Sequence, residues 1–200
     1  MRCLDGAVAV IARPPVVGGK ATSYDDSAAL AIDGVESTHE LPYVAAPVGF
    51  APLGGIAVIA ANTWAAERGR NALQIEWEAG DNGSYTSESY MQEMLETSEQ
   101  PGTVVRDQGD WDAAVSEAAR TVTRTYTQNH MAHIPMEPPA ALANYADGKL
   151  EIWAPVQSPY QTRLDAAKAV GLEPENVTVN VTLLGGGFGR KSKADFVTEA

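Results

Sequence analysis

Cysteine is almost absent from this sequence of 200 residues, which contains only Cys3. A single cysteine excludes an intramolecular disulfide and any metal site built from several thiolates, including a cysteine-bound iron–sulfur cluster. The sequence also shows no signal-peptide pattern and no apolar run long enough to cross a membrane. Internal repeats and low-complexity tracts are missing as well. The chain therefore reads as an ordinary folded segment without a membrane-spanning part.

Positive charge is scarce too, since 14 Lys and Arg residues stand against 26 Asp and Glu residues, for a net charge of −12. Such a balance argues against binding to nucleic acid or to anionic membranes. The one local basic cluster is Arg190, Lys191 and Lys193. We interpret it as a local anion site, with Lys193 more simply a solvated helix charge.

The first part of the chain alternates strand and helix patterns. Residues 7–12, 56–60 and 74–78 read as strands, and Asn62 or Thr63 can cap a helix that runs through Asn71. A turn-rich stretch follows at residues 80–84. These elements predict a compact α/β unit, which we place at residues 1–98.

The second part, residues 99–200, begins after a polar helix predicted from Ser87 to Thr97. Asp110 caps a short helix, residues 120–129 alternate like a long strand, and Asp147-Gly148 joins residues 140–145 and 149–153 in a hairpin. The overall expectation is a mixed α+β fold in two domains, 1–98 and 99–200.

The helix after the hairpin carries several end signals. Ser158 is expected as its N-cap, Pro159 takes the first helical position, Gln161 closes a capping box, and Gly171 ends the helix. Gln157 then lies on the short connection between strand and helix. Taken alone, Gln157 is most simply an exposed loop amide.

A glycine-rich loop, Gly185-Gly-Gly-Phe-Gly-Arg-Lys191, follows a strand pattern at residues 177–184. Glycines let the backbone turn its N–H groups toward a ligand at close range. The triphosphate-binding pattern fails because Arg190 precedes Lys191-Ser192, and the dinucleotide pattern fails because its last glycine would be Arg190 or Ser192. A simple tight turn is the alternative. The four glycines and the following cations favour a ligand.

Other candidate residues have simpler explanations. A zinc site from the three histidines is disfavoured because two of them follow a strand pattern. Glu137, fixed between prolines, suits a structural carboxylate better than a general acid or base. The four tryptophans fall on apolar faces and are expected in the core. These residues are His39, His130, His133, Glu137, Trp64, Trp77, Trp111 and Trp153.

Three segments together resemble a known family: Leu184–Lys191, Ala154-Pro-Val-Gln-Ser-Pro159, and His133-Ile-Pro-Met-Glu-Pro138. They look like the molybdopterin-binding large subunit of the xanthine dehydrogenase and aldehyde oxidase family. The Arg after the last glycine and the segment Ala12-Arg-Pro-Pro15 look most like the isoquinoline 1-oxidoreductase β-subunit type. The resemblance spans nearly the whole chain, and its motifs occur in the family's order.

The resemblance implies a hammerhead-like α/β unit followed by the start of a molybdenum-cofactor-binding α+β domain. It implies a molybdopterin cytosine dinucleotide cofactor bound by Gln157, Gly186, Gly187, Phe188, Gly189 and Arg190, with no protein ligand to the metal. Gln157 would donate a hydrogen bond to an oxygen on the metal. The implied reaction hydroxylates a small N-heteroaromatic compound or oxidises an aldehyde, and water supplies the oxygen. Electrons would pass to a separate small [2Fe-2S] subunit.

Two departures from the family pattern bear on these expectations. Some relatives carry a substrate-orienting Glu just after the glycine loop, and residues 190–193 here contain none. The family's subunit is several times longer, so we expect these residues to be a fragment whose catalytic Glu lies beyond Ala200 and which is inactive alone. The competing hypothesis is a non-catalytic α/β module that binds a ligand or anion.

Overall fold

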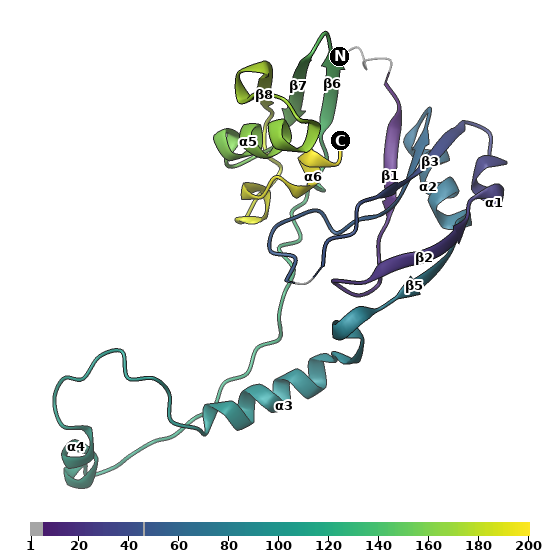
Figure 1. The fold of residues 1–200 in the computed structure, drawn as a ribbon. Helices are drawn as coiled ribbons and strands as arrows, with labels where there is room; N and C mark the ends of the chain where they lie inside the picture. Colours follow the sequence, from purple (N-terminus) through teal and green to yellow (C-terminus); the bar gives the residue numbers. More distant parts are fainter. Residues whose placement is uncertain (1–5, 46) are drawn as a thin grey trace. The chain divides into compact units, whose positions relative to one another are not determined.

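The computed structural model describes residues 6–45 and 47–200 (Figure 1). Cys3 lies outside the described residues. Spatial contacts divide the chain into two units, one formed by the residues up to Gly83 together with His133–Ala200, and the other by Ser84–Ala132. Within the described residues, no helix is long and apolar enough to cross a membrane.

An antiparallel three-stranded sheet in the order β1-β4-β3 organises the N-terminal part of the first unit. The uniformly apolar β4 occupies the centre because both of its faces are covered. A smaller antiparallel pair joins β2 to β5. The elements are β1 (Val8–Ala12), β2 (Lys20–Asp25), α1 (Ser27–Leu30), β3 (Val35–Leu41), β4 (Gly55–Ala60), α2 (Thr63–Ala72), β5 (Gln74–Glu78) and the 3-10 helix η1 (Gly80–Ser84).

Helix α2 packs directly on this sheet. Its N-cap is Asn62, whose side-chain oxygen accepts a hydrogen bond from the Ala65 N–H at 2.9 Å. A glycine permits the close approach, since a Cβ on Gly69 would lie 2.8 Å from Cγ1 of Val58 and 3.0 Å from Cγ2 of Val35. The predicted strands and helix of this region are confirmed.

A second three-stranded sheet, β6-β7-β8, organises the C-terminal part of the first unit (Figure 1). Strands β6 and β7 form the predicted hairpin, with Asp147 (φ 51°) and Gly148 (φ 71°) in its turn. Strand β8 pairs with β7 in parallel, and α5 makes the crossover between them. The elements are β6 (Leu142–Ala146), β7 (Lys149–Ala154), α5 (Pro159–Val170), η2 (Pro174–Asn176), β8 (Val177–Val181), η3 (Arg190–Ser192) and α6 (Asp195–Thr198).

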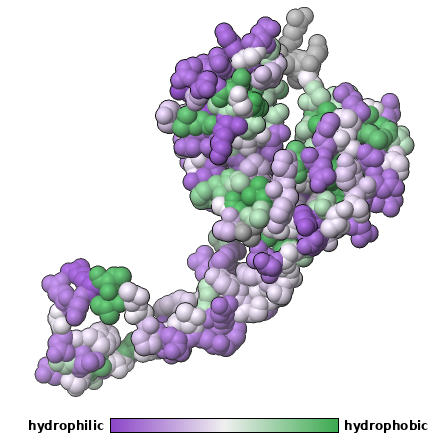
Figure 2. All heavy atoms as spheres, viewed as in Figure 1, coloured by the Kyte–Doolittle hydropathy of each residue, from purple (hydrophilic) through white to green (hydrophobic). Residues whose placement is uncertain are grey.

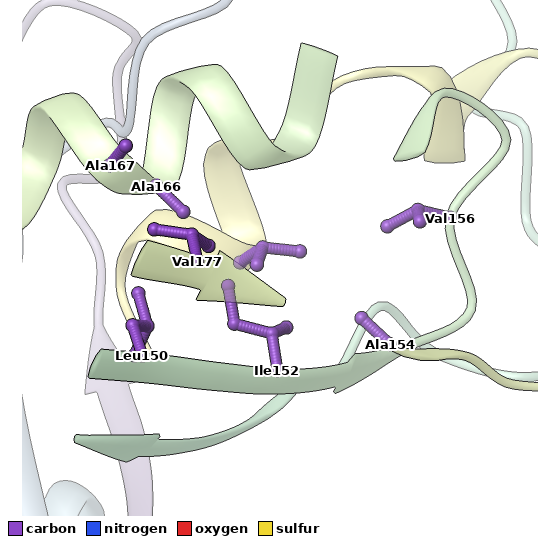
Figure 3. Close-up of a cluster of buried hydrophobic side chains, with 8 residues drawn as sticks. Leu150, Ile152, Ala154, Val156, Ala166, Ala167 and Val177 are labelled. Carbon is purple, nitrogen blue, oxygen red and sulfur yellow. The ribbon is translucent and has the colours of Figure 1, made fainter. Parts of the chain in front are cut away.

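The core of this part lies between β7, β8 and the inner face of α5 (Figure 3). Alternate residues of β7 point inward, and two consecutive small residues of α5 let the helix approach the sheet. The buried residues are Leu150, Ile152, Ala154, Val156, Ala166, Ala167, Val177 and Val197. Gly171 ends α5 in the left-handed conformation (φ 69°), as predicted. The capping box is wrong, because the Gln161 amide donates to Asp165 and Ser158 makes no side-chain cap bond.

The second unit contains α3 (Ser87–Ser98) and α4 (Trp111–Glu117), which begin at the caps Thr86 and Asp110. The predicted strand at residues 120–129 is wrong, because these residues are irregular and exposed. Alternation alone does not make a strand when no neighbouring strand of the described chain supplies a hydrogen-bonding partner. Figure 2 shows hydrophobic residues at the surface of this unit, where Val104 and Val105 are exposed.

The tryptophans divide into two kinds. Trp77 and Trp153 are half-buried on their strands. Trp64 and Trp111 are 69% and 79% exposed, so their prediction as core residues is wrong. Both lie in the first turn of a helix. The expected mixed α+β class, by contrast, is confirmed.

Candidate cofactor site

The site lies where two parallel strands end side by side. Gln157 follows β7, and the glycine loop follows β8. Because the carboxyl ends of neighbouring parallel strands meet at one edge of a sheet, the two connections are brought together there. Two hydrogen bonds, described next, join Gln157 to the glycine loop.

Gln157 is held at both its backbone and its side chain. Its backbone N–H donates to the Lys191 carbonyl oxygen at 2.9 Å, and its Oε1 accepts from the Gly189 N–H at 3.1 Å. A backbone N–H can only donate, so the amide oxygen must face Gly189. The exposed Nε2 group, which makes no hydrogen bond within the described chain, is thereby left to donate to a ligand.

The glycine loop presents a run of free backbone donors. Among the described residues, the N–H groups of Gly186, Gly187 and Phe188 make no hydrogen bond, whereas the Gly189 N–H is taken by Gln157. Gly186 and Gly189 have φ of 95° and 89°, and Phe188 itself takes the left-handed region at 52°. Consecutive backbone N–H groups without partners can form a cradle for oxygen acceptors.

Two of the glycines are required by close approach. A Cβ on Gly185 would lie 2.5 Å from Cβ of Glu137, and a Cβ on Gly187 would lie 2.5 Å from Oε1 of Gln157. The loop therefore packs between the Glu137 segment and Gln157. Phe188 projects from it with 72% of its surface exposed.

Glu137 braces the loop, in line with the structural role that the sequence favoured. Its Oε2 accepts from Nζ of Lys191 at 2.6 Å and from the Gly185 N–H at 2.9 Å, and its own N–H donates to the Gly185 carbonyl at 3.0 Å. The Lys191 ammonium, followed by the Gly185 N–H, holds the pKa of the Glu137 carboxyl below its ordinary value of 4.5. Glu137 is thus ionised at neutral pH.

The basic cluster predicted after the loop is not a group of free cations. Lys191 is completely buried against Glu137, which corrects its assignment to an anion site. Arg190 makes two hydrogen bonds to Asp195, at 2.8 and 2.6 Å, and these raise the pKa of the guanidinium. Lys193 is half-buried, with Nζ 3.8 Å from the centroid of the Phe50 ring, so it is not a solvated charge.

Two features of this site were not predicted from the sequence: the ion pair of the buried Lys191 with Glu137 and the pairing of Arg190 with Asp195. A lysine directly after a glycine loop gave no sign that its ammonium would be buried. Asp195 gave no such sign either, because a separation of five residues from Arg190 is not the i,i+3 or i,i+4 spacing of a helical ion pair.

The histidines take no part in this arrangement. Within residues 6–45 and 47–200, no group of three or more His, Cys, Asp or Glu side chains is placed to hold a metal ion. His130 instead packs edge-on against Tyr90, with ring centroids 5.6 Å apart.

The residues present fit the molybdopterin cofactor that the resemblance implies. Three backbone N–H groups and one amide donor without partners in the described chain lie on the two connections that follow β7 and β8, and the glycines leave the backbone open to a ligand. The side chain of Gln157 is neutral and adds no charge. Oxygen and nitrogen acceptors of a pterin or of metal-bound ligands match this set of donors.

Comparison with known proteins agrees with this reading. Residues 95–200 match the molybdopterin cofactor-binding domain. The chain is 27% identical over 202 residues to the isoquinoline 1-oxidoreductase β subunit of Brevundimonas diminuta, covering 96% of this chain and 24% of that protein. It is 32% identical over 136 residues to the aldehyde oxidoreductase molybdenum-binding subunit PaoC of Escherichia coli K12, covering 68% of this chain and 18% of that protein.

A solved structure shows the same fold. Quinoline 2-oxidoreductase from Pseudomonas putida 86 superposes with a TM-score of 0.69 at 20% identity, covering 95% of this chain and 28% of that chain. The chain spans about a quarter or less of the length of the two sequence relatives. The matched domain includes Gln157, Glu137 and the whole glycine loop. The chain thus belongs to the molybdopterin-binding large subunits of the xanthine dehydrogenase and aldehyde oxidase family.

Proposed function

We propose that this chain forms one wall of the molybdenum-cofactor site of a hydroxylase that acts on an N-heteroaromatic compound or an aldehyde. The observation that carries the proposal is the convergence of Gln157 with the donor cradle of the glycine loop at the carboxyl edge of β7 and β8. When bound, the cofactor supplies the two-electron oxidation in which water is the source of oxygen.

Each predicted site residue has a proposed task. The N–H groups of Gly186, Gly187 and Phe188 hydrogen-bond the acceptors of the cofactor, while Nε2 of Gln157 donates to an oxygen on its metal. Gly189 fixes the Gln157 amide through the 3.1 Å bond, so its contribution to cofactor binding passes through that side chain. The exposed Phe188 ring covers the bound group or the substrate.

Arg190 is proposed to meet a phosphate or pterin oxygen. Asp195 takes two of its five N–H donors and fixes the plane of the guanidinium. The remaining donors stay free for a second acceptor. We propose the cytosine dinucleotide form of the cofactor, as the resemblance to the isoquinoline type implies.

Further proposals rest on the resemblance to the family. Electrons leave through a small [2Fe-2S] subunit, because the single cysteine of this chain cannot hold a cluster. The domains are residues 1–98 and 99–200. The 200 residues expressed alone neither bind molybdenum nor oxidise substrate, since they line only one side of the cofactor and contain no catalytic base.

The substrate proposal is tested with the native protein in dye-reduction assays, with isoquinoline and an aromatic aldehyde as separate substrates. We expect dye reduction with at least one of them, and oxygen from ¹⁸O-labelled water in its product. A non-catalytic anion-binding module, the alternative, would bind phosphate or sulfate at the glycine loop and reduce no dye with either substrate.

A further inference from the structure

One carboxylate fastens both ends of the glycine loop. Glu137 bonds Gly185, the first residue of the loop, through two hydrogen bonds that run in opposite directions. The same Oε2 atom bonds Nζ of Lys191, the residue that ends the loop. The side chain of Glu137 therefore links the two ends of the loop, and the five residues from Gly186 to Arg190 form the span between them.

The second end of the span also holds Gln157. The Lys191 carbonyl accepts the Gln157 backbone N–H at 2.9 Å, and the Gln157 side chain returns to Gly189 at 3.1 Å. A displacement of Lys191 would move the amide of Gln157 and the Gly189 N–H together. The position of the donor groups thus depends on Lys191 staying where Glu137 holds it.

The burial of Lys191 makes this dependence strong. Its ammonium is completely inaccessible, while the Glu137 side chain keeps 38% of its surface exposed. A buried ammonium without a partner charge is strongly disfavoured. If Glu137 lost its charge, the buried Lys191 ammonium would be driven toward water, and that movement would release the end of the loop.

We propose, on the basis of the function proposed above, that Glu137 is a positioning residue that holds the glycine loop and Gln157 in their cofactor-binding arrangement through the buried Lys191. Glu137 touches neither substrate nor cofactor in this role. Glu137 acts on the loop alone. Removal of its charge should leave the β7-β8 core folded, because that core is built from apolar residues.

The test uses Glu137→Gln in the native protein, with Glu175→Gln as the matched control. Gln keeps the size and one acceptor oxygen of Glu137 but removes its charge. Glu175 is an exposed glutamate of the same domain and makes no ion pair within the described chain. Lys191→Met, which removes the ammonium but keeps an unbranched chain, is the second variant.

The first readout is hydrogen exchange measured by mass spectrometry, on one peptide that covers the loop and on another that covers β7. We expect Glu137→Gln and Lys191→Met to speed exchange in the loop peptide by roughly tenfold or more, as for loss of a charged hydrogen bond. The β7 peptide and the Glu175→Gln control should match the unchanged protein. Equal acceleration in β7 would assign Glu137 to general fold stability and overturn the proposal.

The second readout is molybdenum per chain, which should fall severalfold in Glu137→Gln and stay unchanged in Glu175→Gln. Exchange and metal content equal to the unchanged protein in both Glu137→Gln and Lys191→Met would also overturn the proposal. Failure of the proposed function is a separate result, because the unchanged protein would then contain no molybdenum while the exchange readout still decides the role of Glu137.

Discussion

Gly187→Ala offers a quantitative test of how tightly Gln157 and the glycine loop fit together. The added Cβ would lie 2.5 Å from Oε1 and 2.7 Å from Cδ of Gln157. Gly187 does not lie in the left-handed region, so alanine adds no backbone strain there. The whole effect should come from the collision, which forces the Gln157 amide to turn away from Gly189.

The cost has two parts. Loss of the bond between the Gly189 N–H and Gln157 is worth about 0.5–1.5 kcal/mol, and the overpacking is worth about 1–3 kcal/mol. Gln157→Ala alone should cost only the first part. In the double variant the obstruction is gone, so its cost should be close to that of Gln157→Ala. The double-variant cost minus the two single costs should therefore be about −1.5 to −4.5 kcal/mol, equal in size to the cost of Gly187→Ala alone.

The quantity to measure is the free energy of opening the loop, obtained from hydrogen exchange of the loop peptide in the native protein. Additive costs of the two single changes would refute the reasoning, because they would mean that Gly187 and Gln157 do not touch. Gly102→Ala is the control, since nothing lies within 4 Å of a Cβ at that position.

Three further predictions concern single features. Gln157→Ala should lower kcat by a factor equivalent to about 1–3 kcal/mol while most of the molybdenum stays bound, and unchanged turnover would make it an ordinary loop amide. Lowering the pH from 7 to below the lowered pKa of Glu137, which lies under 4.5, should release the glycine loop. The release is measured as faster hydrogen exchange of the loop peptide, after correction for the pH dependence of the intrinsic exchange rates. A carboxyl whose pKa is lowered in the folded state stabilises the closed loop at pH values above its ordinary pKa, and this stabilisation is lost as the carboxyl protonates. A pH response that persists in Glu137→Gln would contradict this explanation. Gly69→Ala should destabilise the protein by about 1–3 kcal/mol in denaturant unfolding despite the better helix propensity of alanine, because its Cβ meets Val58 and Val35, and added Val58→Ala should recover part of the loss.

The neighbourhood of Gln157 and the glycine loop could be predicted because it depends on local patterns and one topological rule. The sequence predicts a hairpin, then a helix with clear end signals, then another strand. This order puts Gln157 after one strand and Gly185 after the next. A parallel crossover then brings both strand ends to one edge. No knowledge of side-chain packing was needed for that step.

The partners of the charged residues could not be predicted in the same way. Glu137 and Lys191 are 54 residues apart, and only the folded chain shows that they share a hydrogen bond. From sequence, Lys191 was interpreted as part of a local anion site with Arg190. The strand at residues 120–129 failed for a related reason, since its alternation was real but a strand also needs a neighbour.

The most direct question is whether the native protein carries the cofactor that this site is proposed to hold. Molybdenum per chain, measured by elemental analysis together with the nucleotide released by acid hydrolysis, answers that question in one preparation. We predict about one molybdenum per chain and release of cytidine monophosphate, the nucleotide expected from the cytosine dinucleotide form. A pure, folded native protein from molybdate-supplied cells that contains no molybdenum and releases no nucleotide would contradict the account.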